Sequence, residues 1–156
     1  MAMLRSMAAA DLEAILTIQN ASPDAAQWPA ADWGVFCARE DAAEHGGLRV
    51  GNCAWVAEGE RGAAGFLAGL FAGDEFEILN LAVAPSERRK RIASQLLLAA
   101  LQSARKAGGR RAILEVRAFN TGAIAFYEGQ GFVRAGIRKN YYRAPVEDAL
   151  ILARDL

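Results

Sequence analysis

The residues of this chain that could do chemistry are concentrated in its second half, beginning with a basic run. Four consecutive cations at 88–91 follow the apolar stretch 79–85 and precede a segment typical of a long helix. A helix start offers unpaired backbone N–H groups and a partial positive charge, a combination that suits a phosphate or pyrophosphate. A solvated basic turn is the alternative interpretation. An RNA contact has less support, because no aromatic residues interleave the basic run.

Other catalytic chemistries find little support in the residue types. The single histidine, His45, stands beside two glycines, where a solvated loop residue is expected rather than a member of a nucleophilic triad. One histidine with two cysteines, Cys37 and Cys53, does not make a zinc site, and nothing requires a disulfide. The glycines at 129–131 follow an expected helix, so they indicate a helix stop rather than a dinucleotide loop. We therefore expect no metal.

The composition fits one cytoplasmic domain. The 156 residues include 18 Lys and Arg against 18 Asp and Glu, so the formal charge is zero. A neutral chain lacks the positive field of a general nucleic-acid binder. The longest apolar runs, such as 96–101, are far shorter than a membrane span, and the first residues show no apolar signal region. We expect a single domain over 1–156 with no nucleic-acid and no membrane partner.

Hydrophobic periodicity and turn residues predict the elements that must position the reactive groups. The expected strands are 3–6, 53–57, 64–71, 75–83, 112–116, 132–137 and 148–153. The expected helices are 11–19, 30–38, 92–107 and 121–130. The helix 92–107 is the clearest, because its apolar residues share one face: Ile92, Leu96, Leu97, Ala100, Leu101 and Ala104. Strands and helices that alternate in the second half predict an α/β domain with a mixed central sheet flanked by helices.

Two motifs in the second half resemble those of a known family, the GCN5-related N-acetyltransferases (GNAT). The run Arg88-x-x-Arg91-x-Ala93 is similar to the family's cofactor loop, Gln/Arg-x-x-Gly-x-Gly/Ala. The segment 114–132 is similar to LEVRxxNxxAIxLYExxGF of the RimI branch, the ribosomal-protein-alanine N-acetyltransferases. Two further segments, 138–142 and 147–152, also resemble that branch. The resemblance is therefore carried by the second half, and the first half agrees with it in layout.

One residue departs from the family's pattern. Arg91 occupies the place of the loop's first glycine, where glycine lets the backbone approach a pyrophosphate without a Cβ. An arginine costs roughly 1–2 kcal/mol if this position needs a left-handed conformation. Its guanidinium could instead pair with a phosphate. The departure bears on cofactor affinity and not on the fold.

The resemblance implies transfer of acetyl from acetyl-CoA, the co-substrate, to a primary amine by direct attack in a ternary complex. The acceptor it implies is the N-terminal α-amine of a protein, a ribosomal protein beginning with Ala. Two alternatives stay open. One is an acceptor that is a lysine or a small-molecule amine. The other is a degenerate, non-catalytic module that holds CoA poorly and works through protein contact, which Arg91 keeps open.

For the chemistry itself, the resemblance implies a base and an acid. Glu115 matches the family's base, and it is expected to be half-buried because Leu114 and Val116 would point to the opposite face of the strand. Glu77 is the rival, because it resembles the base position of the superfamily's histone-acetylating branch. Tyr127 matches the acid that protonates the leaving thiolate. An ordinary strand-face glutamate and a core tyrosine are the alternative interpretations.

The resemblance also implies which residues meet the cofactor. A backbone N–H within 80–83 would stabilise the oxyanion. Asn120, an N-cap by type, would contact the cofactor as well. The full set expected to bind the cofactor is Leu81, Ala82, Val83, Arg88, Arg89, Lys90, Arg91, Ile92, Ala93, Ser94, Asn120 and Tyr127.

On the acceptor side, the expected residues are Glu77, Asn80, Tyr141 and Tyr142. The two tyrosines are expected on a loop after the strand 132–137, where adjacent aromatic rings could hold a short peptide N-terminus. Packing under the last strand is the alternative for them. The segment 28–33, which carries two tryptophans, is expected to form the opposite wall.

Overall fold

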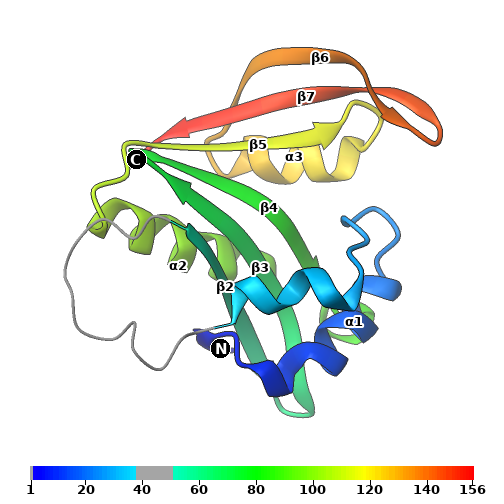
Figure 1. The fold of residues 1–156 in the computed structure, drawn as a ribbon, viewed down its shortest axis with the longest axis vertical. Helices are drawn as coiled ribbons and strands as arrows, with labels where there is room; N and C mark the ends of the chain where they lie inside the picture. Colours follow the sequence, from blue (N-terminus) through cyan, green and yellow to red (C-terminus); the bar gives the residue numbers. More distant parts are fainter. Residues whose placement is uncertain (1, 38–50) are drawn as a thin grey trace.

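One mixed sheet organises the chain in a computed structural model, which describes residues 2–37 and 51–156 (Figure 1). Its strands are β1 (Met3–Ser6), β2 (Gly51–Gly59), β3 (Gly62–Ala72), β4 (Glu75–Val83), β5 (Arg111–Arg117), β6 (Val133–Arg143) and β7 (Val146–Asp155). The helices are α1 (Leu12–Asn20), α2 (Ile92–Lys106) and α3 (Thr121–Gly129), with short 3₁₀ segments η1 (Ala9–Asp11), η2 (Ala30–Phe36) and η3 (Pro85–Glu87). The strand order is β1-β2-β3-β4-β5-β7-β6, and only the β4–β5 pair is parallel. The predicted α/β class is confirmed.

The sheet opens between β4 and β5. The two strands pair only over 75–78 and 111–114, although β4 continues to Val83 and β5 to Arg117. A bulge lies at the same point, because Ile78 pairs with Gly69 of β3 whereas Asn80 pairs with the preceding residue, Ala68. Figure 1 shows the resulting V, with β5, β6 and β7 on one arm and β2, β3 and β4 on the other. The opening exposes backbone of β4 on the side that would otherwise face β5.

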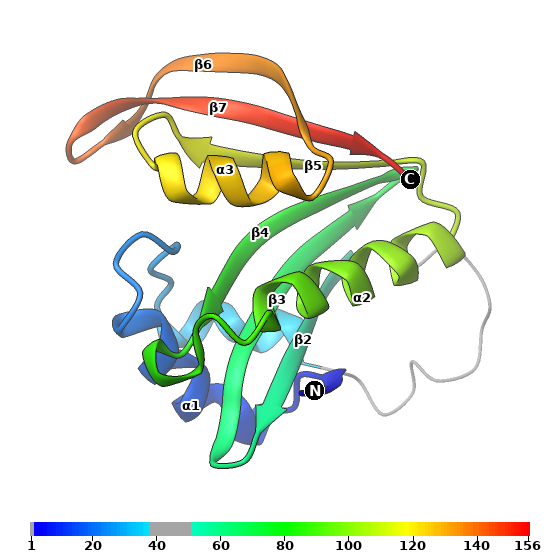
Figure 2. The same cartoon turned by 180° about the vertical axis from the view of Figure 1, so that it is seen from behind.

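The helices α2 and α3 cover one face of the sheet, as the view from behind shows (Figure 2). The six residues predicted to form the apolar face of α2 are all buried, in a core that also contains Phe76 and Leu114. A stripe of apolar residues at helical spacing is stable only when it is removed from water, so its burial fixes how α2 lies on the sheet.

The opposite face is covered by α1 and η2, which build a second core. Ile15 and Ile18 of α1 pack there with Trp33 and Phe36 of η2 against Phe66 of β3. Trp33 meets Phe66 edge to face, with ring centroids 5.1 Å apart. Each face of the sheet therefore has its own helices and its own core.

Two expected elements differ from the observed ones. The strand expected at 132–137 continues to Arg143, so Tyr141 and Tyr142 lie on β6 and not on a loop. The polar residues of 138–143 give no apolar alternation because β6 is an edge strand whose residues are mostly exposed. The helix expected at 30–38 is the 3₁₀ segment η2, which ends at Phe36. Over the described ranges, 2–37 and 51–156, the helices are too short or too polar to cross a membrane.

Candidate active site

The basic run forms the entry to α2, and Arg91 is its N-cap. Arg91 adopts the left-handed conformation, with φ of 61° and ψ of 20°, as glycine would at little cost. The first N–H of the helix with an intrahelical partner belongs to Gln95, which donates to the Arg91 carbonyl at 3.0 Å. The N–H groups of Ile92, Ala93 and Ser94 thus form the open helix start, and no acidic residue stands in the first turn.

A cavity of about 270 Å³ lies at this helix start. Its lining residues come from the end of β4, the loop, the first turn of α2 and α3: Val83, Glu87, Arg88, Arg89, Arg91, Ile92, Ala93, Ser94 and Phe126. Seven of these were expected to bind the cofactor. Phe126 was missed, although it neighbours Tyr127 in the motif. Open N–H groups, small Ala93 and local cations give a cradle that fits the pyrophosphate of acetyl-CoA.

Two other cations of the loop, Arg88 and Lys90, are engaged with the protein. Arg88 donates to the carbonyls of Val83 and Ala21, at 3.3 and 3.4 Å, and to the Ser22 hydroxyl at 3.4 Å. Lys90 pairs with Glu87 at 3.0 Å.

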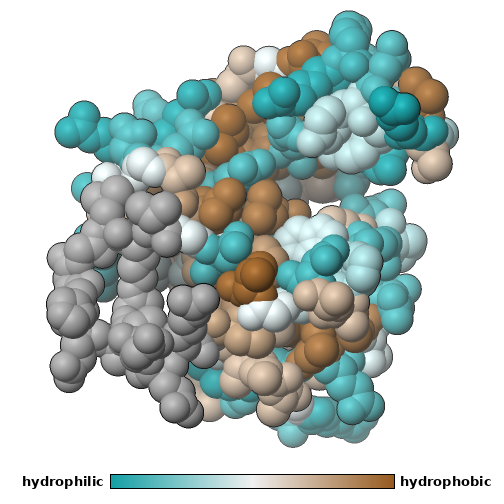
Figure 3. Space-filling view, in the orientation of Figure 1, coloured by the Kyte–Doolittle hydropathy of each residue, from teal (hydrophilic) through white to brown (hydrophobic). Residues whose placement is uncertain are grey.

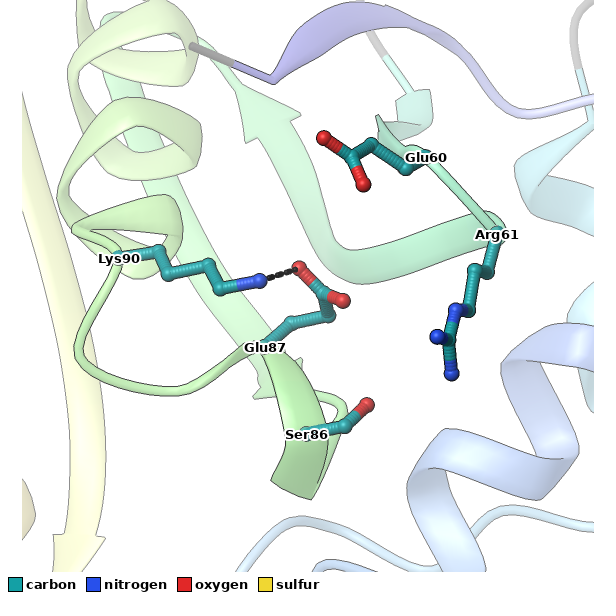
Figure 4. A pocket seen from close by; sticks show the side chains of 5 residues that line it. All are labelled: Glu60, Arg61, Ser86, Glu87 and Lys90. Atoms are coloured by element: carbon teal, nitrogen blue, oxygen red, sulfur yellow. Dashed lines mark hydrogen bonds and ion pairs between the residues drawn. The ribbon is translucent and has the colours of Figure 1, made fainter.

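A second hollow, of about 260 Å³, lies on the other side of the loop, beside the turn between β2 and β3. Arg61 and Lys90 reach into it from opposite sides (Figure 4). It is separate from the opening between β4 and β5.

The other expected cofactor residues of β4 divide between the two faces. Leu81 packs against the core under α2, whereas the side chain of Ala82 is buried in the core under α1. The side chain of Ala82 therefore cannot line the cavity at the start of α2, and only its backbone remains available.

Glu77 and Glu115 project from the face of the sheet opposite α2. Their neighbours Phe76 and Leu114 point into the core under α2, so the alternation of each strand turns both carboxylates the other way. Burial, followed by the charges of Glu115 and Glu75, raises the pKa of Glu77. The side chain of Glu115 is 19% exposed, as the half-buried position predicted.

Two side chains of β6 reach the Glu115 carboxylate. Arg138 Nε lies 2.6 Å from Glu115 Oε1. A hydrogen bond from Tyr141 to Glu115 is the largest cause of the raised pKa of the Tyr141 phenol. The Arg138 side chain passes over β7 to reach Glu115. Its partner in the β6–β7 register is Ala149, whose short side chain leaves room for the guanidinium.

A bulge in β6 turns Tyr141 toward this carboxylate. Between the pairs Arg138–Ala149 and Tyr142–Glu147, β6 has three residues and β7 has one, Asp148. Asn140 takes a positive φ of 51° there, and its N–H donates to Asp148 Oδ1 at 2.8 Å. Such bulges commonly re-aim a side chain next to an active site.

The ring of Tyr141 packs against that of Tyr142, with centroids 5.1 Å apart, and Tyr142 also belongs to a tighter cluster. The Arg117 guanidinium lies 4.1 Å from its ring centroid, and Arg117 Nη1 is 3.5 Å from Oε1 of buried Glu147. The other oxygen of Glu147 accepts the N–H of Phe119 at 2.9 Å. This cluster fixes the β6–β7 hairpin to the segment between β5 and α3.

The helix α3 places Tyr127 and is capped as predicted. The Asn120 side chain accepts the Ala123 N–H at 3.1 Å. Tyr127 is 8% exposed and lies between the rings of Phe126 and Phe132. Burial raises the pKa of its phenol, so Tyr127 is protonated at neutral pH.

The acceptor side is closed by the segment between α1 and η2. Asn80 is 4% exposed and its amide donates to the Ala26 carbonyl at 3.0 Å, which holds this segment to β4. The expected wall at 28–33 is wrong in part, because Trp33 is completely buried in the second core and only Trp28 is partly exposed. Figure 3, which views this face, shows the surface hollowed between the arm with β5–β7 and the part with α1 and η2.

The remaining groups named from the sequence are His45 and two partly buried cysteines, Cys37 and Cys53. His45 lies outside the described residues. Within 2–37 and 51–156, no three His, Cys, Asp or Glu side chains gather into a group that could hold a metal.

A sheet that opens beside a helix N-terminus offers a place for an anionic cofactor, and the sequence comparison specifies the class of protein. Residues 12–132 match the model of the acetyltransferase (GNAT) family. The chain belongs to this family.

Within the family, the chain is similar to several named acetyltransferases. The chain is 43% identical over 82 residues to the [ribosomal protein bS18]-alanine N-acetyltransferase of Escherichia coli (strain K12), over 51% of this chain and 55% of that one. The match thus spans about half the length of that relative. The crystal structure of the ribosomal-protein-S18-alanine N-acetyltransferase from Escherichia coli superposes with a TM-score of 0.80 at 28% identity, over 99% of this chain and 94% of that one. A GNAT family acetyltransferase from Elizabethkingia anophelis, solved with acetyl-CoA bound, shares the fold with a TM-score of 0.63 at 22% identity, over 67% and 76%.

Proposed function

We propose that the protein transfers acetyl from acetyl-CoA to the N-terminal α-amine of a protein, a ribosomal protein that begins with Ala, in the cytoplasm. The observation that carries the proposal is the opening between β4 and β5, which has the open start of α2 at one side and two carboxylates at the other. The relative named as a bS18-alanine N-acetyltransferase supports the choice of acceptor.

The start of α2 would hold the pyrophosphate. Backbone N–H groups of Ile92, Ala93 and Ser94 would donate to its oxygens, with help from the helix dipole. The acetyl-CoA so held supplies an activated acyl thioester. Backbone N–H groups of β4 beyond Ile78, where pairing with β5 has ended, would face the thioester carbonyl and stabilise negative charge there.

The acid and base would lie on opposite faces of the sheet, because Tyr127 belongs to the core under α2 and Glu115 projects from the other face. Tyr127 would donate its proton to the leaving sulfur, since a phenol is protonated at neutral pH. Burial raises its pKa and so makes it a weaker acid, which limits its contribution to the rate. Glu115, with Glu77 beside it, would take the proton from the ammonium of the acceptor. An α-amine has a pKa of roughly 7.7–8.0 and a lysine about 10.4, so a carboxylate base suits the α-amine better.

The proposal is tested with acceptors that separate the alternatives. A peptide beginning with Ala is compared with the same peptide blocked at its N-terminus but carrying an internal lysine, and with alanine amide. Mass gain of one acetyl group and release of the CoA thiol are both followed. Acetylation of the first peptide alone supports the proposal, and acetylation of only the lysine or only alanine amide overturns the proposed acceptor. Binding of acetyl-CoA without transfer to any of them would indicate the non-catalytic module.

A further inference from the structure

The two arginines on the acceptor side of the sheet are held very differently. Arg117 is stacked on Tyr142 and paired with buried Glu147, and its Nη1 atom is itself buried. Arg138 has a side chain that is 55% exposed, extends from an edge strand, and has its only short ion pair within the described chain at Glu115. The Arg138 guanidinium also lies 5.9 Å from the centroid of the Tyr141 ring. Arg117 is therefore a fixed part of the fold, whereas Arg138 is free to swing into solvent.

The pairing of Arg138 with Glu115 conflicts with the role of Glu115 as a base. A carboxylate oxygen that already accepts a guanidinium N–H at 2.6 Å is occupied, so it is not open to the ammonium of an acceptor. The paired arrangement consequently describes a resting state of the free protein. A base that accepts a proton from an incoming ammonium has to exchange one cation for another.

The charges around Glu115 fit such an exchange. On the sheet face near it, the ionisable groups come from four strands: Glu75 and Glu77 of β4, Arg111 and Arg117 of β5, Arg138, Tyr141 and Tyr142 of β6, and Glu147 and Asp155 of β7. Arg111 lies 3.9 Å from Glu75, and Arg117 lies 3.5 Å from Glu147. These pairs leave Glu77 and Glu115 to share the single charge of Arg138, so the site attracts a further cation.

We propose that Arg138 is the displaceable counter-ion of the acceptor site: in the free protein its guanidinium occupies the place on Glu115 that the acceptor's ammonium takes, and it leaves when the acceptor binds. This inference rests on the proposed function. Arg138 thereby becomes a specificity-determining residue, because an acceptor must carry a cation that competes with a guanidinium for the same carboxylate. A neutral acceptor cannot release the base.

The test uses two substitutions of Arg138 and a matched control on the same strand. Arg138→Met keeps the apolar stem over Ala149 and removes the charge, and Arg138→Lys keeps a charge. Arg134→Met is the control, because Arg134 also lies on β6 and pairs with a glutamate, Glu128, at 3.0 Å away from the site. Each protein is assayed for kcat and KM with the peptide that begins with Ala, from pH 5.5 to pH 9.

For Arg138→Met we expect the peptide KM to fall about two- to fivefold, the range that a half-exposed ion pair supports. The plateau value of kcat should be retained. Arg138 lowers the pKa of Glu77, so its removal should move the acidic limb of kcat/KM to higher pH. Arg138→Lys should bring the limb back toward the wild type, and Arg134→Met should leave both quantities unchanged.

If Arg138→Met leaves the KM unchanged or raises it, and the acidic limb of kcat/KM does not move, the proposal that Arg138 is a displaceable counter-ion is wrong. A fall in kcat in a folded variant would instead make Arg138 an orienting group for Glu115. If the wild type acetylates no amine, the proposed function fails separately. The counter-ion is then judged by binding of ethylammonium, followed by the carboxyl NMR signal of Glu115: tighter binding to Arg138→Met supports it, and equal binding overturns it.

Discussion

Glu77 and Glu115 stand on neighbouring strands and on the same face of the sheet, and the negative charge of Glu115 helps to raise the pKa of Glu77. Two carboxylates that repel each other ionise less readily together than apart, so one of them holds its proton to a higher pH. The arginine beside Glu115 breaks the symmetry between them. Glu77 and Glu115 therefore have different electrostatic surroundings and can serve different roles.

Substitution of each glutamate separates those roles. We expect Glu115→Gln to lower kcat/KM more than Glu77→Gln, with the largest loss at low pH, where the acceptor amine is protonated and base help matters most. Loss of the Glu115 charge should also lower the pKa of Glu77, which carboxyl NMR titration would detect as an earlier ionisation. Greater damage from Glu77→Gln would place the base on β4 instead.

Tyr127→Phe tests the acid. The ring keeps its packing between Phe126 and Phe132, so the free energy of unfolding should change little. Turnover should fall by roughly 10²–10⁴, the range for a positioned acid, toward the low end because a thiolate needs less acid help than an alkoxide. Calorimetry should find acetyl-CoA affinity almost unchanged, since the proton is needed mainly in the transition state. Full activity in a folded variant would reduce Tyr127 to a packing role.

Arg91→Gly tests the departure from the family's loop. A non-glycine residue in the left-handed region costs roughly 1–2 kcal/mol of folding free energy, and glycine removes that cost. Glycine also gives the unfolded chain more conformational entropy, which offsets part of the gain in stability. We therefore expect a net gain of about 0.5–1 kcal/mol in the free energy of unfolding, measured with urea. Acetyl-CoA affinity should change by less than about tenfold, because lost strain and lost charge oppose each other.

Arg88→Gly is the matched control for that measurement. Arg88 is three residues earlier in the same loop but has an ordinary φ of −65°. It also donates to Ala21 and Ser22. Its replacement should lower stability where that of Arg91 raises it. A loss of stability in both variants would show that the left-handed conformation of Arg91 carries no strain.

The clamp between Arg5 and Asp11 should make stability depend on pH. Both Asp11 oxygens accept from Arg5 at 2.7 Å, and hydrogen bonds from Arg5 lower the pKa of Asp11. A lowered pKa means that the stabilisation is complete above the ordinary value of 3.8 and is lost as the pH falls through the folded-state value. Asp11→Asn should cost about 1–2 kcal/mol at pH 7 in urea unfolding, and the difference from wild type should shrink near pH 3.

Glu58→Gln provides the comparison for the Asp11 measurement. Glu58 also pairs with Arg5 at 2.7 Å, but its side chain is 33% exposed against 11% for Asp11. More exposed pairs contribute less, so we expect a smaller loss at pH 7. A larger loss than that of Asp11→Asn would contradict this assignment.

The sequence predicts a structural feature most accurately where that feature depends only on neighbouring residues. The apolar face of α2 follows the helical period, and burial requires nothing further from distant residues. The bounds of β4 are confirmed because Pro85 stops the strand and alternation marks its length. Asn120 caps α3 through a hydrogen bond only three residues long.

Features that depend on pairing register could not be predicted in this way. The bulge at Asn140 arises because β6 and β7 differ in residue count between two pairs, and no local pattern encodes that difference. Contact between Arg138 and Glu115 requires β7 to lie between their strands, which the chain order does not reveal. The burial of Trp33 reflects packing on Phe66, a residue far away in sequence.

The contacts of Arg88 connect the loop before α2 to the end of α1. One guanidinium ties the loop before α2 to Ala21 and Ser22, at the end of α1 and next to the segment that Asn80 holds. Any occupant of the loop that draws Arg88 toward itself takes a donor away from the end of α1. Linkage is reciprocal, so an acceptor that rearranges the end of α1 must change the affinity of the loop for its occupant by the same factor. Cooperativity between two substrates would then depend on the Arg88 side chain, which need not touch either reacting atom.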